Sequence, residues 1–392
     1  MNLTELFFNM IRSIAVKLVL EHIYYNRGIN MKKKIFAVMC AAVMLTGCGN
    51  SSASKKQELE IPPQYVPYEI VKVEPVFEEG KNSQWYQDFC RQLLEYNNEP
   101  VVEEKVSKKE FQYALRQLST DLPDVFWLTN AWFNMGSKRT RLEFNYMQGC
   151  DENNIKPMHE ELEKAADDLI RLIPENGSDY EKILFVHDYI AQNTVYDASV
   201  DYETGSGLCY TAYGCLVNKK AVCQGYAEAF TYIMNRMGIE SGVCQGDTYA
   251  GGHAWNYVMI DGEYYWLDIT WDDTDNDTFP VSHNYFLFND EIMSRTRKAE
   301  WEQNFAPVCT ADKYNWFVVN NTFLGEYDFD LINSLSAQHS GNSLELMFKD
   351  YDSYVSALQG LVNDGSINKL SGVSTASSYY HDDRNFSFTI IY

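Results

Sequence analysis

The chain has 392 residues, of which 45% are hydrophobic and 15% aromatic, a composition that indicates a globular protein and excludes a disordered one. Its 55 acidic residues outnumber 32 Lys and Arg, giving a formal net charge of −23 at pH 7. Such a surface repels phosphates, so we expect no nucleic acid partner and no charge-driven binding to anionic lipid.

The N-terminal segment runs from charged to apolar to small residues. Lys32-Lys33-Lys34 is followed by an apolar stretch, residues 35–45, too short to span a bilayer, and then by Leu45-Thr46-Gly47-Cys48. The segment resembles a bacterial lipoprotein signal peptide over residues 31–47. That resemblance implies a lipid on Cys48 and an extracytoplasmic location at the cell membrane.

Residues 1–30 precede this signal, whereas a signal peptide begins at its own N-terminus. We therefore expect Met31 to be the true start and residues 1–30 to be a misassigned upstream stretch. The alternative is that residues 11–23 form a second membrane-associating segment.

The next part of the chain is a tether followed by a small α/β region. Residues 48–68 form the tether, in which residues 50–56 are polar and three prolines, at positions 62, 63 and 67, favour an extended chain. Residues 69–150 carry no motif that we can connect to chemistry. Within them the patterns predict two helices and then two strands, at Ser83–Tyr96, Lys105–Leu118, Val125–Trp132 and Arg141–Tyr146.

Two amphipathic helices, at 156–173 and 180–194, are predicted to open the region 151–309. His187 and Asp188 are adjacent in the second helix, so they point about 100° apart. A structural role is therefore favoured for this pair. We also interpret Tyr213, farther along, as a packed residue in preference to a donor at a substrate carbonyl.

A helix starting near Cys223 is predicted next, because apolar residues recur three and four positions apart until Gly238. Cys223 would lie in or just before the first turn. There the unpaired backbone N–H groups and the helix macrodipole favour a thiolate. Gly225 would let another backbone come close to the sulfur. The apolar stripe is Tyr226, Phe230, Ile233, Met234 and Met237.

Two strands joined by a tight turn are predicted after this helix. Residues 253–260 alternate, residues 263–271 are rich in aromatic and β-branched side chains, and Asp261-Gly262 between them is a two-residue hairpin signal. In that register Ile260 faces Glu263.

The same register brings a histidine and an aspartate together. Trp255 would face Asp268 and His253 would face Thr270, so His253 and Asp268 become diagonal neighbours on one face of the hairpin. Side chains can meet at such positions, where Cα atoms are roughly 7–8 Å apart. A loop of three residues would put them on opposite faces.

A thiol, an imidazole and a carboxylate can act as nucleophile, base and orienter of the base. The surrounding motifs are Cys223-Gln-Gly-Tyr-Ala, His253-Ala-Trp-Asn and Trp266-Leu-Asp268-Ile-Thr-Trp271. They resemble the transglutaminase-like superfamily, a branch of the papain-type thiol enzymes, over about residues 155–290. The resemblance implies a catalytic triad of Cys223, His253 and Asp268. It also implies an α+β fold with the active-site helix packed on an antiparallel sheet.

Each of these three residues also has a structural interpretation. Cys223 could be a small buried hydrophobe, His253 a satisfied surface or core residue, and Asp268 the cap of the following turn. The domain could also keep the fold and use its groove only to bind.

The sequence supports no metal or cofactor site, because neither a CxxC nor an HExxH pattern occurs. Residues 272–277 offer carboxylates for calcium but lack the spacing of a calcium-binding loop, so we interpret them as a solvated loop. The remaining cysteines fit no compact disulfide scaffold, and Cys209 with Cys215 is the pair to test first.

Residues 310–392 are predicted to form a small α/β domain outside the resemblance. The expected elements are a strand, a helix, a strand, a helix and a strand, at Trp316–Asn320, Phe329–Ala337, Leu344–Lys349, Tyr351–Val362 and Phe386–Ile391.

The expected function is that of a surface-anchored thiol enzyme acting on amide bonds of proteins or cell-wall peptides. Water as acceptor would give a protease or amidase, an amine would give a transglutaminase, and no turnover would give a binding module. Hydrolysis is favoured because the register puts Trp271 on the opposite face from His253, while Trp255 and Trp266, which share the face of His253, more often pack than line an apolar channel. The sequence also shows no calcium site and no acidic groove that would direct a lysine to the thioester.

Overall fold

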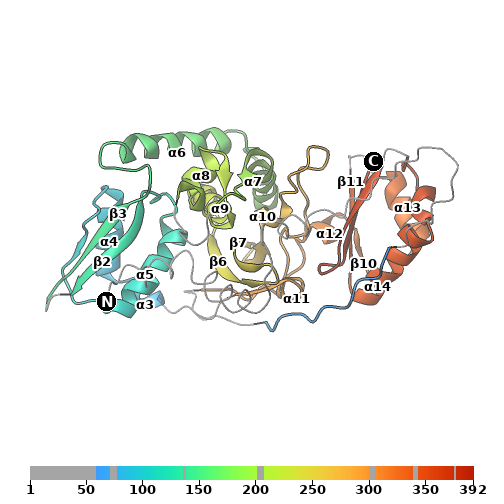
Figure 1. Cartoon of the computed structure of the whole chain (residues 1–392), viewed down its shortest axis with the longest axis horizontal. Helices are drawn as coiled ribbons and strands as arrows, with labels where there is room; N and C mark the ends of the chain where they lie inside the picture. Colours follow the sequence, from blue (N-terminus) through green and yellow to red (C-terminus); the bar gives the residue numbers. More distant parts are fainter. Residues whose placement is uncertain are drawn as a thin grey trace.

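The computed structural model describes residues 59–70, 77–135, 138–200, 207–299, 305–338, 343–374 and 377–392. The predicted signal peptide, Cys48 and most of the tether lie outside these ranges. In the described part, no helix combines the length and the hydropathy needed to cross a membrane. The molecule is elongated, with an N-terminal sheet at one end, the Cys223 helix in the centre and a C-terminal sheet at the other end (Figure 1).

The N-terminal region consists of three helices and a three-stranded sheet in the order β1-β3-β2. Helix α5 begins at Lys108, three residues later than predicted, because Ser107 and Glu110 form a capping box. The core of this region is continuous with that of the central region, and Phe126 stacks on Tyr213 at 4.7 Å between ring centroids. The elements are α3 (Glu78–Lys81), α4 (Gln84–Leu94), β1 (Val101–Val102), α5 (Lys108–Asp121), β2 (Leu128–Met135) and β3 (Thr140–Tyr146).

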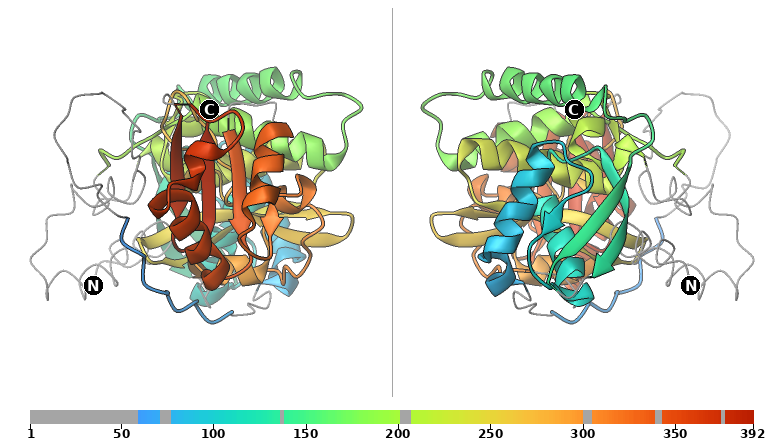
Figure 2. Two further views of the ribbon diagram at one scale, coloured as in Figure 1. Left: turned by 90° about the vertical axis from the view of Figure 1, so that its right-hand side faces the viewer. Right: turned by 90° about the vertical axis from the view of Figure 1, so that its left-hand side faces the viewer.

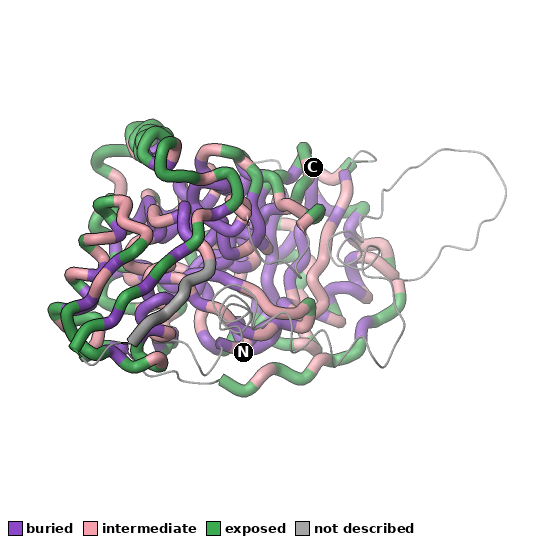
Figure 3. Tube along the Cα trace, turned by 60° about the vertical axis from the view of Figure 1, so that its left-hand side comes forward, coloured by how far each residue is buried: buried purple, intermediate pink, exposed green. Residues whose placement is uncertain are grey.

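The central region packs helix α9 (Cys223–Met237) against a four-stranded sheet in the order β8-β7-β6-β9. Gly238 ends α9 with a φ of 72°, as predicted. Strand β6 was not predicted, yet it pairs with both β7 and β9. Residues 224–234 of α9 are all buried, and Figure 3 shows that the middle of the molecule is mostly buried. The strands are β6 (Ser241–Thr248), β7 (Gly251–Ile260), β8 (Glu263–Leu267) and β9 (Arg297–Ala299).

Shorter elements surround α9 and the sheet. The two predicted amphipathic helices are confirmed as α6 and α7. The elements are α6 (Ile155–Ile170), α7 (Asp179–Asn193), β4 (Val195–Tyr196), η2 (Leu208–Tyr210), α8 (Ala212–Leu216), β5 (Lys220–Ala221), α10 (Ile269–Asp272) and α11 (Asp290–Ser294).

The register of the central hairpin is confirmed, with Ile260 opposite Glu263. Asp261 and Gly262 both have positive φ, 53° and 82°, as a two-residue type I′ turn requires. The predicted length of the second strand is wrong, because β8 ends at Leu267 and α10 follows at once. The cause is the side chain of Asp268, which accepts a hydrogen bond from the backbone N–H of Trp271 and caps α10.

The C-terminal region forms a four-stranded sheet in the order β10-β11-β13-β12, which lies in front, with its strands upright, in the left view of Figure 2. The predicted strand at 316–320 is wrong: Asn315 accepts a hydrogen bond from the N–H of Phe317 and starts a short helix. Two further strands, β10 and β12, were not predicted. The elements are α12 (Trp316–Val319), β10 (Phe323–Leu324), α13 (Phe329–Gln338), β11 (Ser343–Phe348), α14 (Tyr351–Ala357), η3 (Leu358–Asn363), η4 (Ser366–Lys369), β12 (Ser378–Asp382) and β13 (Ser387–Ile391).

Residues 59–70, the described end of the predicted tether, are held against the protein. The N–H of Leu59 donates to Asn363 Oδ1 at 2.8 Å, and Tyr351 Oη donates to the carbonyl of Pro62 at 2.5 Å. The guanidinium of Arg384 lies 3.7 Å from the ring centroid of Tyr65. This part of the segment is therefore docked on the C-terminal and central regions.

Candidate active site

Cys223 is the first residue of α9, and its side chain is partly exposed. The first backbone N–H groups of a helix have no partner within the helix, so they point toward any charge that forms on the sulfur. A Cβ atom added to Gly225 would lie 2.5 Å from the carbonyl oxygen of Cys209. The glycine therefore allows a second backbone to pack tightly against the first turn of α9.

His253 and Asp268 are joined by a hydrogen bond of 2.8 Å between Nε2 and Oδ2, although β8 ends before Asp268. Both side chains are buried, at 7% and 1% exposure. Because Nε2 faces the carboxylate, Nδ1 is the nitrogen left to exchange a proton with the thiol of Cys223. Burial alone would lower the pKa of His253, but Asp268 and Cys223 raise this pKa to about 9.

Asp268 performs two structural tasks with its two carboxylate oxygens. Oδ1 accepts from the N–H of Trp271 at 3.3 Å, so the capping interpretation of this residue is correct. Oδ2 accepts from His253 and from the guanidinium of Arg297. Burial would raise the pKa of Asp268, but His253 and Arg297 lower it to about 2. The carboxylate is therefore ionised at any pH near neutrality.

Arg297 is a component of the site that the sequence analysis missed. It lies on β9, opposite Thr248 of β6, and its side chain is fully buried. Its guanidinium lies over the rings of Trp271 and Tyr285, at 4.1 and 4.6 Å from their centroids. No local motif indicates this residue, because β9 lies far from the hairpin in sequence. It reaches the site only by pairing with β6 in the folded sheet.

We expect Arg297→Lys to lower kcat by on the order of 10²-fold with little change in KM. A lysine keeps the charge but cannot reproduce the planar stacking, so Asp268 and His253 shift, and a misplacement of about 1 Å can cost this much. Steady-state kinetics on folded protein checks the split between kcat and KM. An unchanged kcat would assign Arg297 to packing alone.

The expected position of Trp271 is wrong. Its ring centroid lies 5.1 Å from that of His253, and the ring of Trp255 also lies near this histidine, at 6.1 Å. The chain turns into α10 after Asp268, so the alternation of a strand no longer applies to Trp271. Trp255 and Trp266 do pack together at 6.2 Å, and each is 1% exposed.

Asp272 and Asp273 are not part of a solvated loop, contrary to expectation, because both are buried. Asp272 Oδ2 contacts His187 Nε2 at 3.1 Å, and Asp273 Oδ2 accepts from Tyr226 Oη at 2.7 Å. The structure thus brings Asp272 to His187, which is fully buried, whereas the neighbouring Asp188 is partly exposed.

Two other sequence-based interpretations concern side chains near α8. Tyr213 is packed as expected, and its hydroxyl donates to Glu161 Oε2 at 2.6 Å. Cys215 is a fully buried thiol 3.3 Å from Thr194 Oγ1, so it is not bridged to Cys209.

Comparison with known proteins agrees with this geometry. Residues 169–269, which include Cys223, His253 and Asp268, match the family described as the transglutaminase-like superfamily. The chain contains a transglutaminase-like domain. The mixed α/β structure, with a cysteine-bearing helix packed on an antiparallel sheet, is the core expected for this superfamily.

Curated relatives that this chain matches include kyphoscoliosis peptidase from two mammals. The human protein is 26% identical over 183 residues, covering 43% of this chain and 27% of its own length. The mouse protein is 26% identical over 133 residues, covering 30% of this chain and 20% of its own length. This chain therefore spans only about a quarter of the curated relatives it matches. A solved structure of a TGase is similar with a TM-score of 0.27 and 14% identity, over 46% of this chain and 47% of that chain.

Proposed function

We propose that this protein is a thiol enzyme that acts on amide bonds of proteins or cell-wall peptides through an acyl thioester on Cys223. One observation carries the proposal: His253 is fixed by Asp268 through Nε2, with Nδ1 left for the thiol at the start of α9. The match to the transglutaminase-like superfamily over the same residues supports it.

In the first half of the reaction, His253 Nδ1 takes the proton of the Cys223 thiol, and Cys223 Sγ attacks the carbonyl carbon of the amide. The negative charge on the carbonyl oxygen is stabilised by the backbone N–H of Cys223. His253 then donates its Nδ1 proton to the departing amine, and the C–N bond breaks to leave a thioester.

In the second half, His253 Nδ1 accepts a proton from the incoming nucleophile, which attacks the thioester and releases Cys223. Water yields a carboxylic acid, and a primary amine yields a new amide. Asp268 keeps the imidazole in one orientation and one tautomer throughout.

We propose water as the main acceptor, because Trp255 and Trp266 pack together in the core, although Trp271 lies beside His253 and not on the opposite face. A transferase needs an apolar channel that admits an amine and excludes water. Trp255 and Trp266 are 1% exposed, so they belong to the core and cannot line an open channel. Of these three tryptophans, Trp271 alone is partly exposed and able to line such a channel.

The choice of acceptor is tested with a glutamine-containing protein and a labelled primary amine. We expect peptide or ammonia release to exceed label incorporation, with Cys223→Ala as the blank. Incorporation that depends on Cys223 and outpaces hydrolysis at millimolar amine would establish a transglutaminase, the second candidate function.

We further propose that Cys48 carries a lipid that anchors the protein to the outer side of the cell membrane. The order of charged, apolar and small residues ending at Cys48 supports this location. Cys48→Ala should abolish incorporation of a radiolabelled fatty acid, measured after growth with the label. Unchanged lipid labelling in that variant would refute the anchor.

A further inference from the structure

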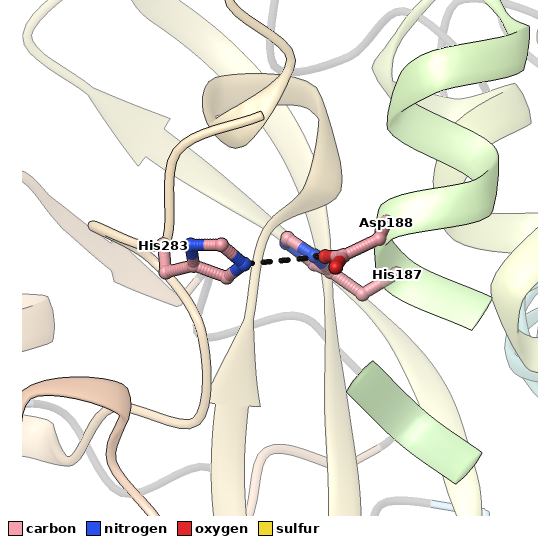
Figure 4. Close-up of side chains that lie close together, drawn as sticks. All are labelled: His187, Asp188 and His283. Atoms are coloured by element: carbon pink, nitrogen blue, oxygen red, sulfur yellow. Dashed lines mark hydrogen bonds and ion pairs between the residues drawn. The ribbon is translucent and has the colours of Figure 1, made fainter. Parts of the chain in front are cut away.

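Five titratable side chains form a largely buried cluster where three parts of the chain meet. His187 and Asp188 come from α7, Asp272 from α10, His283 from the segment that follows α10, and Glu345 from β11. Figure 4 shows His283 directed toward Asp188, which lies beside His187 on the facing helix. Asp188 is the most exposed of the five, at 33% of its side chain.

Each of the two imidazoles has one ring nitrogen on a buried carboxylate and the other on Asp188. His187 Nε2 contacts Asp272 Oδ2 at 3.1 Å, and His283 Nδ1 contacts Glu345 Oε1 at 2.7 Å. The opposite ring nitrogens, Nδ1 of His187 and Nε2 of His283, lie 2.9 and 3.2 Å from the same atom, Asp188 Oδ1. Two nitrogens and one oxygen thus converge, each nitrogen backed by a carboxylate on the far side of its ring.

This is the arrangement of metal-binding histidines, which generally donate their second N–H to a carboxylate or carbonyl that fixes the ring. One ligand atom from each of His187, Asp188 and His283 lies within 4.8 Å of the others. Tetrahedral zinc with bonds of about 2.0–2.1 Å separates its ligands by roughly 3.3 Å. The observed separations of 2.9 and 3.2 Å from Asp188 Oδ1 are close to that value.

The surroundings favour a fixed site. Trp316 stacks on His283 at 3.6 Å between ring centroids, and Phe286 packs edge-on against His187 at 4.9 Å. The side chains of His187 and His283 are 0% and 10% exposed. The more open Asp188 provides a route for an ion and a place for a water molecule as the fourth ligand.

Charge balance permits the exchange of protons for a metal. The three carboxylates are those of Asp188, Asp272 and Glu345. When all three are ionised they can only accept hydrogen bonds, so each histidine needs a proton on both of its ring nitrogens. A divalent cation that replaces the two protons facing Asp188 leaves the net charge of the cluster unchanged. The buried charge therefore does not oppose metal binding.

We propose that His187, Asp188 and His283 form a zinc site, with Asp272 and Glu345 as the carboxylates that orient the two histidines. Zinc fits two imidazoles and a carboxylate better than magnesium or calcium, which prefer oxygen ligands. The CxxC and HExxH patterns do not detect such a site, because its ligands come from separate segments of the chain. The bound ion would link α7, the chain after Asp268 and the C-terminal sheet.

The test uses the full chain with Cys223→Ala, which removes the thiol beside His253 as a competing zinc ligand. The protein is stripped with a chelator and titrated with zinc sulfate under reducing conditions, and bound metal is counted after equilibrium dialysis. We expect one zinc per chain and a higher midpoint of thermal unfolding. Cobalt in place of zinc should give a tetrahedral visible spectrum without thiolate charge transfer.

His283→Ala and Asp188→Asn should each abolish this zinc and the thermal shift. Asp188→Asn retains the shape of the side chain, so a loss of zinc in this variant cannot be attributed to misfolding. Glu345→Gln should lower the affinity for zinc by about 10–100-fold, as the loss of a carboxylate that orients a metal-binding histidine does. His159→Ala, which removes a buried histidine beside Asp124, should bind zinc normally. No uptake, or uptake unaffected by His283→Ala and Asp188→Asn, would overturn the site and leave an ion-pair network.

Discussion

Cys223→Ala is expected to lower turnover by on the order of 10⁶, as removal of the nucleophile does in comparable triads. Without the sulfur no thioester can form, and His253 and Asp268 have no nucleophile to activate. The free energy of unfolding should change little, because the side chain is partly exposed and small. Release of amine from a peptide substrate, measured beside a denaturation curve, checks both expectations.

The matched control for this variant is Cys150→Ala. Cys150 is also partly exposed, but burial raises the pKa of its thiol to about 11. It should keep full activity. Equal activity in wild type and Cys223→Ala would show that the hydrolysis comes from another group.

Asp268→Asn is expected to reduce kcat by on the order of 10⁴, because an amide no longer fixes the productive tautomer of His253. The carboxylate also helps to hold the pKa of His253 at about 9. A histidine with a raised pKa keeps its proton until the pH passes that value. The alkaline fall of kcat/KM, which reports the free enzyme, should therefore begin near pH 9 in the wild type and at lower pH in Asp268→Asn.

This substitution also leaves the buried Arg297 without its carboxylate, which costs about 3–5 kcal/mol of unfolding free energy. Stability must therefore be measured alongside the rate. Asp273→Asn is the control, since Asp273 is buried and accepts from Tyr226 but does not contact His253. It should be less stable with nearly normal kcat. Normal turnover and an unshifted alkaline limb in Asp268→Asn would make Asp268 a capping residue only.

Local signals were sufficient to predict the helix and the hairpin of the site. The spacing of apolar residues and Gly238 define α9, and Asp261-Gly262 sets a register that depends only on a two-residue turn. The meeting of His253 with Asp268 follows from that register. These features involve residues close in sequence, where chain geometry leaves few alternatives.

Features that depend on tertiary contacts could not be predicted in this way. The strand propensity of residues 269–271 is overridden by the cap that Asp268 provides, and this moves Trp271 beside His253. Arg297 reaches Asp268 only because β9 joins the edge of the sheet at β6. The convergence of His187 and His283 likewise requires the folded chain, since no spacing rule connects them.

The most direct measurement of the central claim is the alkylation of each cysteine by iodoacetamide at pH 7, followed by peptide mapping. Burial raises the pKa of the Cys90, Cys150 and Cys215 thiols to about 12, 11 and 12, so these thiols provide an internal scale of unreactive groups. We expect Cys223 to react far faster than these three, and His253→Ala to remove most of that advantage. Labelling of Cys223 at the rate of a free cysteine, unchanged in His253→Ala, would contradict the proposal that His253 activates Cys223 as a nucleophile.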